Sequence, residues 1–260
     1  MNQLLEISNL CKNFGGISAI QGLNLSMVKG EILGIIGPNG SGKTTLINLI
    51  SGIYAPTRGR IVFKGRNITG AKPNKLVRLG LTRTFQAAVL YSEATVLENV
   101  LRGTHLIQEV GFFHLLFHSM KARQREKQAI EKAKEILALM GLEELLDQEA
   151  GNLSYGYQKS LGVALGLATG PELLMLDEPA AGLSMEEASE ISEIIKKINN
   201  RGVSLVVVDH NMKFIMPLCH RIIVLNYGQK ISEGGPQAIQ KDEKVIKAYL
   251  GGGNDGGEYY

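Results

Sequence analysis

A glycine-rich octapeptide constrains the fold of this chain more than any other segment. Residues 37–44 read Gly-Pro-Asn-Gly-Ser-Gly-Lys-Thr and match the pattern G-x-x-x-x-G-K-[ST] at every fixed position. An apolar run precedes them at residues 31–36, and a helical pattern follows at residues 45–53. Glycines let backbone N–H groups turn inward around phosphate oxygens, and the positive end of the following helix adds to that field. The segment therefore predicts a strand, a phosphate-binding loop and a helix.

The residue types in this loop indicate a nucleotide ligand. Lys43 is expected to place its charge on the β- and γ-phosphates, and the Thr44 hydroxyl to ligate Mg²⁺. A glycine-rich turn without a ligand is the alternative, but the lysine, threonine, strand and helix together favour a nucleotide. The residues expected to bind ATP are Gly37, Pro38, Asn39, Gly40, Ser41, Gly42, Lys43, Thr44 and Thr45.

Two carboxylates follow a second apolar run at residues 173–176. In proteins with a phosphate loop, an Asp at the end of such a strand holds Mg²⁺. A carboxylate one residue further on can act as a general base on the attacking water. We therefore expect Asp177 on the metal side and Glu178 on the water side. The alternative is a pair of ordinary strand-end acids, which the phosphate loop makes less favoured.

Alternation of apolar runs and helical patterns predicts an α/β fold, a P-loop NTPase core with a mainly parallel sheet. Residues 203–208 and 222–225 are continuous apolar runs, which suit strands covered on both faces. Helical spacing lies between such runs at Ala188, Ile191, Ile195 and Ile198. Segments 4–7, 23–27 and 60–63 are typical of antiparallel strands, so we expect an N-terminal antiparallel β subdomain.

The middle of the chain is typical of an inserted α-helical subdomain. Ile130, Ala133, Leu137 and Met140 share one helical stripe, and the charged residues within 121–134 are interpreted as its solvated face rather than a binding patch. We expect a single domain over 1–250, with a core of 1–94 and 166–250 and a helical subdomain of 95–165. The glycine-rich residues 251–260 are expected to form a flexible tail.

Composition excludes several classes of protein. A net charge of +3 with 20% charged residues is unlike a nucleic-acid-binding chain, so no nucleic-acid partner is expected. No apolar run reaches the roughly 18 residues of a membrane-spanning helix, and the first residues do not read as a signal peptide. Cys11 and Cys219 are far apart and are expected to be reduced and buried, as in a cytoplasmic protein.

The order of further motifs resembles the ATP-binding subunits of ABC transporters over nearly the whole chain. Residues 84–86, Thr-Phe-Gln, resemble the family's Q-loop, and residues 153–159, LSYGYQK, resemble its signature motif LSGGQ. Residues 180–184 stand at the D-loop, His210 follows an apolar strand as the switch histidine does, and Phe14 stands where the family stacks an aromatic ring on adenine.

This resemblance implies an ATP hydrolase that works as a head-to-tail dimer. Ser154 and Gly156 would contact the γ-phosphate of ATP held by the second subunit. The implied catalytic residues are Glu178, His210 and Gln86, and the implied Mg²⁺ ligands are Thr44, Gln86 and Asp177. The chain departs from the family pattern at Tyr155, Tyr157 and Ser184, which stand for a glycine, the signature glutamine and the D-loop aspartate.

Less specific features resemble the branch of this family that takes up branched-chain and other hydrophobic amino acids. They are the segments 14–16, 83–86, 155–156, 177–183 and 246–251. The branch implies polytopic permease subunits, an external solute-binding protein, a same or paralogous second ATPase subunit, and a peripheral position on the inner face of the cell membrane. Residues 87–96 would help to grip a helix of the permease, although the apolar residues 87–90 suit a core equally well.

Two other functions stay open on sequence. One is a soluble ABC ATPase that acts on DNA ends or ribosomes, which the single domain, short helical insert and near-neutral charge disfavour. The other is a regulatory module that binds ATP with little hydrolysis, which Glu178 and His210 disfavour and which Ser184 and the altered signature leave possible. Cargo, transport direction and the identity of the second ATPase subunit are not encoded in any motif.

Overall fold

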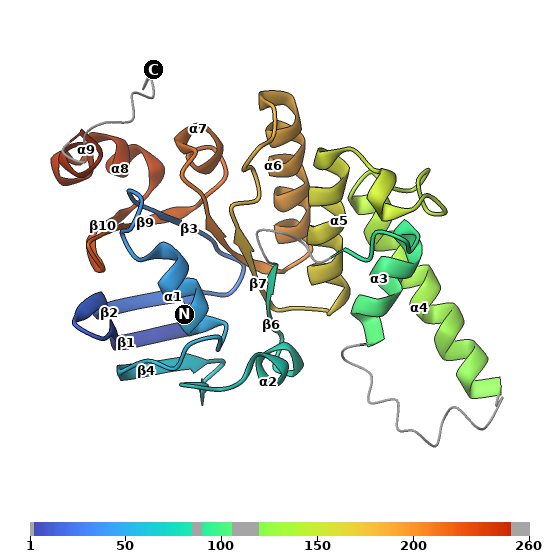
Figure 1. The fold of residues 1–260 in the computed structure, drawn as a ribbon, viewed down its shortest axis with the longest axis horizontal. Helices are drawn as coiled ribbons and strands as arrows, with labels where there is room; N and C mark the ends of the chain where they lie inside the picture. The colour runs from blue at the N-terminus through green and yellow to red at the C-terminus, as the bar shows by residue number, and fades with distance from the viewer. Residues whose placement is uncertain (1–2, 85–89, 106–119, 251–260) are drawn as a thin grey trace. The chain divides into compact units, whose positions relative to one another are not determined.

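The computed structural model describes residues 3–84, 90–105 and 120–250 (Figure 1). The chain divides into two compact units, one of residues 1–72 and 206–260 and the other of residues 73–205. The division falls within strand β8 (Ser204–Val208). The predicted limits of the core and of the helical subdomain stay a prediction.

The first unit begins with an antiparallel sheet in the order β2-β1-β4-β5. Leu5, Ile7 and Leu10 of β1 are buried, and the alternating polar residues face outward. The predicted antiparallel subdomain is confirmed, but its first two strands have 12 residues each, longer than the apolar segments predicted. The strands are β1 (Gln3–Phe14), β2 (Ile17–Val28), β4 (Arg58–Phe63) and β5 (Arg66–Asn67).

The same unit contains the strand that leads into the phosphate loop. β3 (Ile32–Ile36) is buried along its whole length and pairs in parallel with β9 (Arg221–Asn226), with Ile36 opposite Val224. Burial on both faces explains the continuous apolar sequence of β3. The remaining elements of this unit are α1 (Lys43–Ile50), α7 (Met212–Ile215), β10 (Gln229–Gly234), α8 (Pro236–Lys241) and α9 (Glu243–Leu250).

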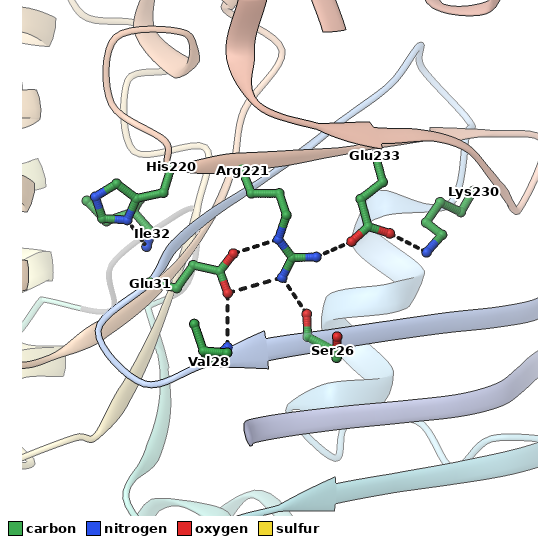
Figure 2. Close-up of polar contacts among 8 residues, drawn as sticks. All are labelled: Ser26, Val28, Glu31, Ile32, His220, Arg221, Lys230 and Glu233. Carbon is green, nitrogen blue, oxygen red and sulfur yellow. Dashed lines mark hydrogen bonds and ion pairs between the residues drawn. The ribbon is translucent and has the colours of Figure 1, made fainter. Parts of the chain in front are cut away.

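A polar cluster around Arg221 links the strands of the first unit (Figure 2). The guanidinium donates to both carboxylate oxygens of Glu31, at 2.7 and 3.1 Å, and to the Ser26 carbonyl at 2.5 Å. It also pairs with Glu233 of β10, which in turn accepts from Lys230. Because Ser26 lies on β2 and Arg221 on β9, the cluster fastens the antiparallel sheet to the strands beside the phosphate loop.

The second unit combines two parallel strands with a group of helices. β6 (Leu81–Thr84) pairs in parallel with β7 (Leu173–Asp177), all of which is buried. Of the predicted stripe, Ala133 and Leu137 of α4 and Met140 just after its end are buried, whereas Ile130 is only partly buried. The charged residues described around them are exposed. The helices are α2 (Pro73–Arg78), α3 (Val96–His105), α4 (Met120–Leu139), α5 (Tyr155–Ala168) and α6 (Met185–Asn200), with a short 3₁₀ helix at Ala150–Asn152.

Two further sequence expectations concern cysteines and membrane spans. Both cysteines are free; Cys219 is buried and Cys11 is partly exposed. Burial raises the pKa of the Cys219 thiol to about 12, so this thiol is neutral at physiological pH. Among the described residues, no helix combines the length and the apolarity that crossing a membrane requires.

Candidate functional site

The phosphate loop lies between β3 and α1, and two of its glycines are required by close backbone neighbours. A Cβ atom on Gly37 would lie 2.2 Å from the Leu225 carbonyl oxygen, and one on Gly42 would lie 2.8 Å from the Ala19 carbonyl oxygen. Both residues also have positive φ, at 152° and 106°. Only glycine satisfies both conditions, so the loop is held tightly against β2 and β9.

Lys43 and Ser41 supply the polar side chains at the centre of this loop. Lys43 is the first residue of α1, and its Nζ donates to the carbonyls of Gly37 at 2.6 Å and Pro38 at 3.0 Å. Ser41 is buried, and its hydroxyl has no hydrogen-bond partner among the described residues. A buried ammonium beside an unsatisfied hydroxyl and the N-terminus of a helix suits an anionic ligand such as a phosphate group.

An aromatic pair stands at the end of β1. The Phe14 ring meets Tyr54 edge to face, with ring centroids 5.3 Å apart, and Phe14 remains 41% exposed. Lys12 Nζ lies 4.9 Å from the Phe14 centroid and donates to the Ala55 carbonyl at 2.8 Å. The expected adenine-stacking residue is therefore an accessible ring that its neighbours hold in place.

His210 lies two residues after β8, at an exposed position. Its side chain is 60% exposed, and Nδ1 lies 3.9 Å from Oδ1 of the fully buried Asp209. Asp209 in turn accepts a hydrogen bond from the Asn211 backbone at 2.9 Å. The buried carboxylate orients the beginning of the next helix and leaves the His210 ring accessible.

In the second unit, Asp177 ends β7 and forms a buried ion pair. Arg83 Nη2 lies 2.7 Å from Asp177 Oδ2, and both side chains are less than a tenth exposed. The parallel pairing of β6 with β7 places Arg83 opposite Met175, next to the carboxyl end of β7. The predicted metal-side carboxylate thus has a cationic neighbour on the adjacent strand.

Glu178 adopts a backbone conformation that non-glycine residues rarely take. Its φ is 49°, in the left-handed region, and its carbonyl closes a turn by accepting from the Ala181 backbone at 3.2 Å. Lys159 Nζ also donates to this carbonyl, at 3.3 Å. A strained backbone at a candidate catalytic residue is typical of a functional site.

The signature residues stand at the start of a helix. Ser154 is the N-cap of α5, and its hydroxyl accepts from the Tyr157 backbone at 3.4 Å. Gly156 faces α6, because a Cβ atom there would lie 2.6 Å from Glu187 Oε1. Glu187 also completes a capping box with Ser184, so its carboxylate caps α6 and lies against the start of α5; both helices lie side by side in Figure 1.

Some expected residues lie outside the described part of the chain, and some relevant neighbours were not predicted. Gln86, the residues 87–89 and the tail 251–260 fall outside it. The contacts of Arg83, Lys159, Tyr54 and Glu187 were missed. All four contacts depend on tertiary packing, including that of Arg83, which requires β6 to lie beside β7.

A strand–loop–helix with a tightly enclosed lysine, together with an acidic strand end, defines a P-loop nucleotide-binding protein. The ABC transporter family model matches residues 20–181, and a model of branched-chain amino acid ATP-binding cassette transporters matches residues 229–255. The high-affinity branched-chain amino acid transport ATP-binding protein LivG of Escherichia coli strain K12 is 39% identical over 249 residues, 95% of this chain and 98% of LivG.

Solved structures agree with these matches. MJ1267, an ATP-binding cassette of an ABC transporter in its ADP conformation, is 32% identical with a TM-score of 0.84, over 96% of this chain and 100% of that chain. A dimeric post-hydrolysis state of the cassette MJ0796, bound to ADP and Pi, is 26% identical with a TM-score of 0.75, over 90% of this chain and 99% of that chain. The chain belongs to the ABC transporter family, among its ATP-binding subunits, which confirms the resemblance drawn from the sequence.

Proposed function

We propose that this chain hydrolyses ATP to power a membrane transporter that takes up branched-chain or related hydrophobic amino acids. The observation that carries the proposal is the phosphate loop, where Lys43 and the unsatisfied Ser41 hydroxyl are enclosed at the start of α1. The amino acid specificity rests on relatives, since LivG and BraF are branched-chain amino acid transport ATP-binding proteins.

Residues of the first unit bind the nucleotide in this proposal. Phe14 stacks on the adenine, because its ring is accessible and held by Tyr54 and Lys12. Backbone N–H groups of the loop and the Lys43 ammonium bind the phosphates. Thr44 and Asp177, with Gln86, would hold Mg²⁺, which neutralises charge on the β- and γ-phosphates when bound.

Glu178 orients and deprotonates the attacking water, and His210 contacts the γ-phosphate. A carboxylate acts as a general base when it is held within hydrogen-bond reach of the water, and the turn at Glu178 fixes its backbone. The accessible ring of His210, anchored beside buried Asp209, suits a contact with a phosphate oxygen. Hydrolysis removes the bound γ-phosphate, and with it the contacts that hold the closed state together.

The working form is a head-to-tail dimer with a second ATPase subunit, either the same chain or a paralogue. Ser154 and Gly156 of one subunit then contact the γ-phosphate held by the other, through a hydroxyl and a backbone N–H at a helix start. The dimeric MJ0796 structure with ADP and Pi supports this arrangement.

Coupling to transport requires partners that cross the membrane. The chain is proposed to attach to polytopic permease subunits on the inner face of the cell membrane, and an external solute-binding protein would deliver the amino acid. Closure of the ATP-bound dimer drives the permease between its outward and inward states.

Size-exclusion chromatography of the Glu178→Gln variant with and without ATP, beside phosphate release by the wild type, tests the proposal. We expect the variant to become dimeric in ATP and to release no phosphate. Equal phosphate release by both proteins would remove Glu178 as the base. ATP binding without turnover by the wild type would favour the regulatory module instead.

A further inference from the structure

Contacts within the second unit join the signature segment, residues 153–159, to the turn that contains Glu178. Lys159, one helical turn after Tyr155 on α5, donates from Nζ to the Glu178 carbonyl at 3.3 Å. The same ammonium lies 5.4 Å from the centroid of the Tyr155 ring. The cation therefore lies between the first turn of α5 and the backbone of the proposed base.

The Glu178 turn is a strained feature that requires external support. A left-handed conformation, with φ of 49°, is unfavourable for a non-glycine residue. The Glu178 carbonyl accepts from the Ala181 backbone at 3.2 Å, and the Lys159 ammonium adds a charge-assisted hydrogen bond to the same oxygen. Without that cation, the peptide bond after Glu178 loses one of the hydrogen bonds that hold its orientation. A change in that orientation would also move the Glu178 carboxylate.

Tyr155 contacts Gly182, the residue that follows the same turn. A Cβ atom on Gly182 would lie 3.0 Å from Tyr155 Cε1, so the ring packs directly against the Gly182 backbone. The Tyr155 side chain also faces the Lys159 ammonium. A glycine at position 155, which the family signature has, would supply neither contact.

We propose that Lys159 and Tyr155 are positioning residues that hold Glu178 in its catalytic orientation. The inference rests on the proposed function, since it takes Glu178 as the base. Because Ser154 and Gly156 stand at the start of the same helix, the segment that binds the ATP of the second subunit also fixes the base for the subunit's own ATP. The tyrosine that breaks the signature pattern is thereby part of the link between the two sites.

The test is steady-state ATP hydrolysis by the full-length chain and its Lys159→Met and Lys159→Arg variants. We expect Lys159→Met to lower kcat at least about tenfold, because a small misplacement of a catalytic group is costly, with KM for ATP changed less than about twofold. Lys159→Arg restores the cation and should return kcat to near the wild-type value. Tyr155→Phe keeps the ring and should retain activity, whereas Tyr155→Gly should lower kcat.

Lys196→Met is the matched control. Lys196 also donates to a neighbour in the second unit, Glu193 at 2.8 Å, but on an exposed face of α6, and its removal should leave kcat unchanged. A second measurement separates positioning from folding: the double variant Glu178→Gln with Lys159→Met should still dimerise in ATP.

Three other outcomes would each overturn a specific claim about Lys159 or about the proposed function. An active wild type with an unchanged Lys159→Met kcat would overturn this inference and leave the proposed function standing. A kcat loss accompanied by loss of ATP-dependent dimerisation would make Lys159 a structural residue of the signature helix. A wild type with neither turnover nor ATP-dependent dimerisation, alone and with a paralogous second subunit, would overturn the proposed function and the inference together.

Discussion

Arg221 and Glu31, 190 residues apart in the sequence, form a bidentate ion pair where β3 and β9 begin (Figure 2). The Arg221 guanidinium binds both oxygens of a carboxylate that is only 7% exposed. The hydrogen bond that Arg221 donates to Glu31 raises the pKa of Arg221 above its ordinary value, so the guanidinium stays charged. The pair thus connects the strand before the phosphate loop with a strand made much later in the chain.

Replacing Arg221 with Met should destabilise the protein by about 2 kcal/mol, because the substitution leaves a buried carboxylate without its partner. Urea unfolding at neutral pH measures this loss. Lys247→Met is the control, since Lys247 pairs with Glu243 at 3.5 Å on the surface and its loss should change stability by less than about 0.5 kcal/mol. A variant as stable as the wild type would show that the pair contributes nothing net.

Glu233 should make stability depend on pH in the acid range. Burial works to raise its pKa, but hydrogen bonds and charges from Lys230 and Arg221 outweigh burial and hold the pKa below its ordinary value of 4.5. A carboxyl with a lowered pKa stabilises the fold above its unfolded-state value and loses that contribution as pH falls through the folded-state value. The stability gap between the wild type and Glu233→Gln should therefore be constant near neutral pH and shrink below about pH 4.5.

Urea unfolding of both proteins over a pH series measures this gap. Glu243→Gln serves as the control, because the exposed Glu243 pair should give a small gap at every pH. A Glu233 gap that widens on acidification would contradict the assigned direction.

Ser41→Ala separates stability from ligand binding. The buried Ser41 hydroxyl lacks a partner among the described residues. An unsatisfied buried hydroxyl lowers the free energy of unfolding by about 1–3 kcal/mol. The variant without nucleotide should be at least as stable as the wild type, while its stabilisation by ATP and Mg²⁺ should be smaller. Thermal unfolding with and without nucleotide measures both effects.

Ser51→Ala is the matched control for Ser41. Its buried hydroxyl donates to the Ile47 carbonyl at 2.8 Å, so the variant should lose about 1 kcal/mol and keep the full nucleotide effect. An undiminished ATP effect in Ser41→Ala would mean that this hydroxyl does not face the phosphates.

Ser184 should contribute to stability as a helix cap. Its hydroxyl accepts from the Glu187 backbone at 3.2 Å, and the Glu187 carboxylate accepts from the Ser184 backbone N–H at 2.9 Å. Ser184→Ala should therefore cost about 1 kcal/mol in urea unfolding, whereas Ser184→Asp should keep the cap. The exposed Ser189→Ala on the same helix is the control. Equal losses at both serines would contradict the capping role.

Sequence patterns predicted the buried strands and the loop because those features are local. Ile32–Ile36 and Leu173–Asp177 are buried throughout, so each is a continuous apolar run with a recognisable end. The resemblance of residues 153–159 to the family signature is also local, and Ser154 and Gly156 stand at the start of α5.

Other features depended on contacts between distant segments. β1 extends to Phe14 because it pairs with β2 well beyond its apolar part, and alternation with polar residues concealed that length. The Arg83–Asp177 pair requires the alignment of β6 beside β7. The contacts of Gly156 with Glu187 and of Lys159 with Glu178 require the packing of α5 against the residues after β7. No local pattern specifies any of these.

The walls of the phosphate loop have a consequence for synthesis on the ribosome. Gly37 is enclosed by the Leu225 carbonyl, and the Gly228 backbone donates to the Ser41 carbonyl at 2.9 Å. Those residues are translated nearly two hundred positions after the loop, whereas residues 73–205 form one uninterrupted unit. The ribosome therefore completes residues 73–205 before it makes Leu225 and Gly228. The phosphate loop is enclosed by these residues only in the last stage of translation. Premature termination before β9 would yield a chain with the whole motif and no enclosed loop.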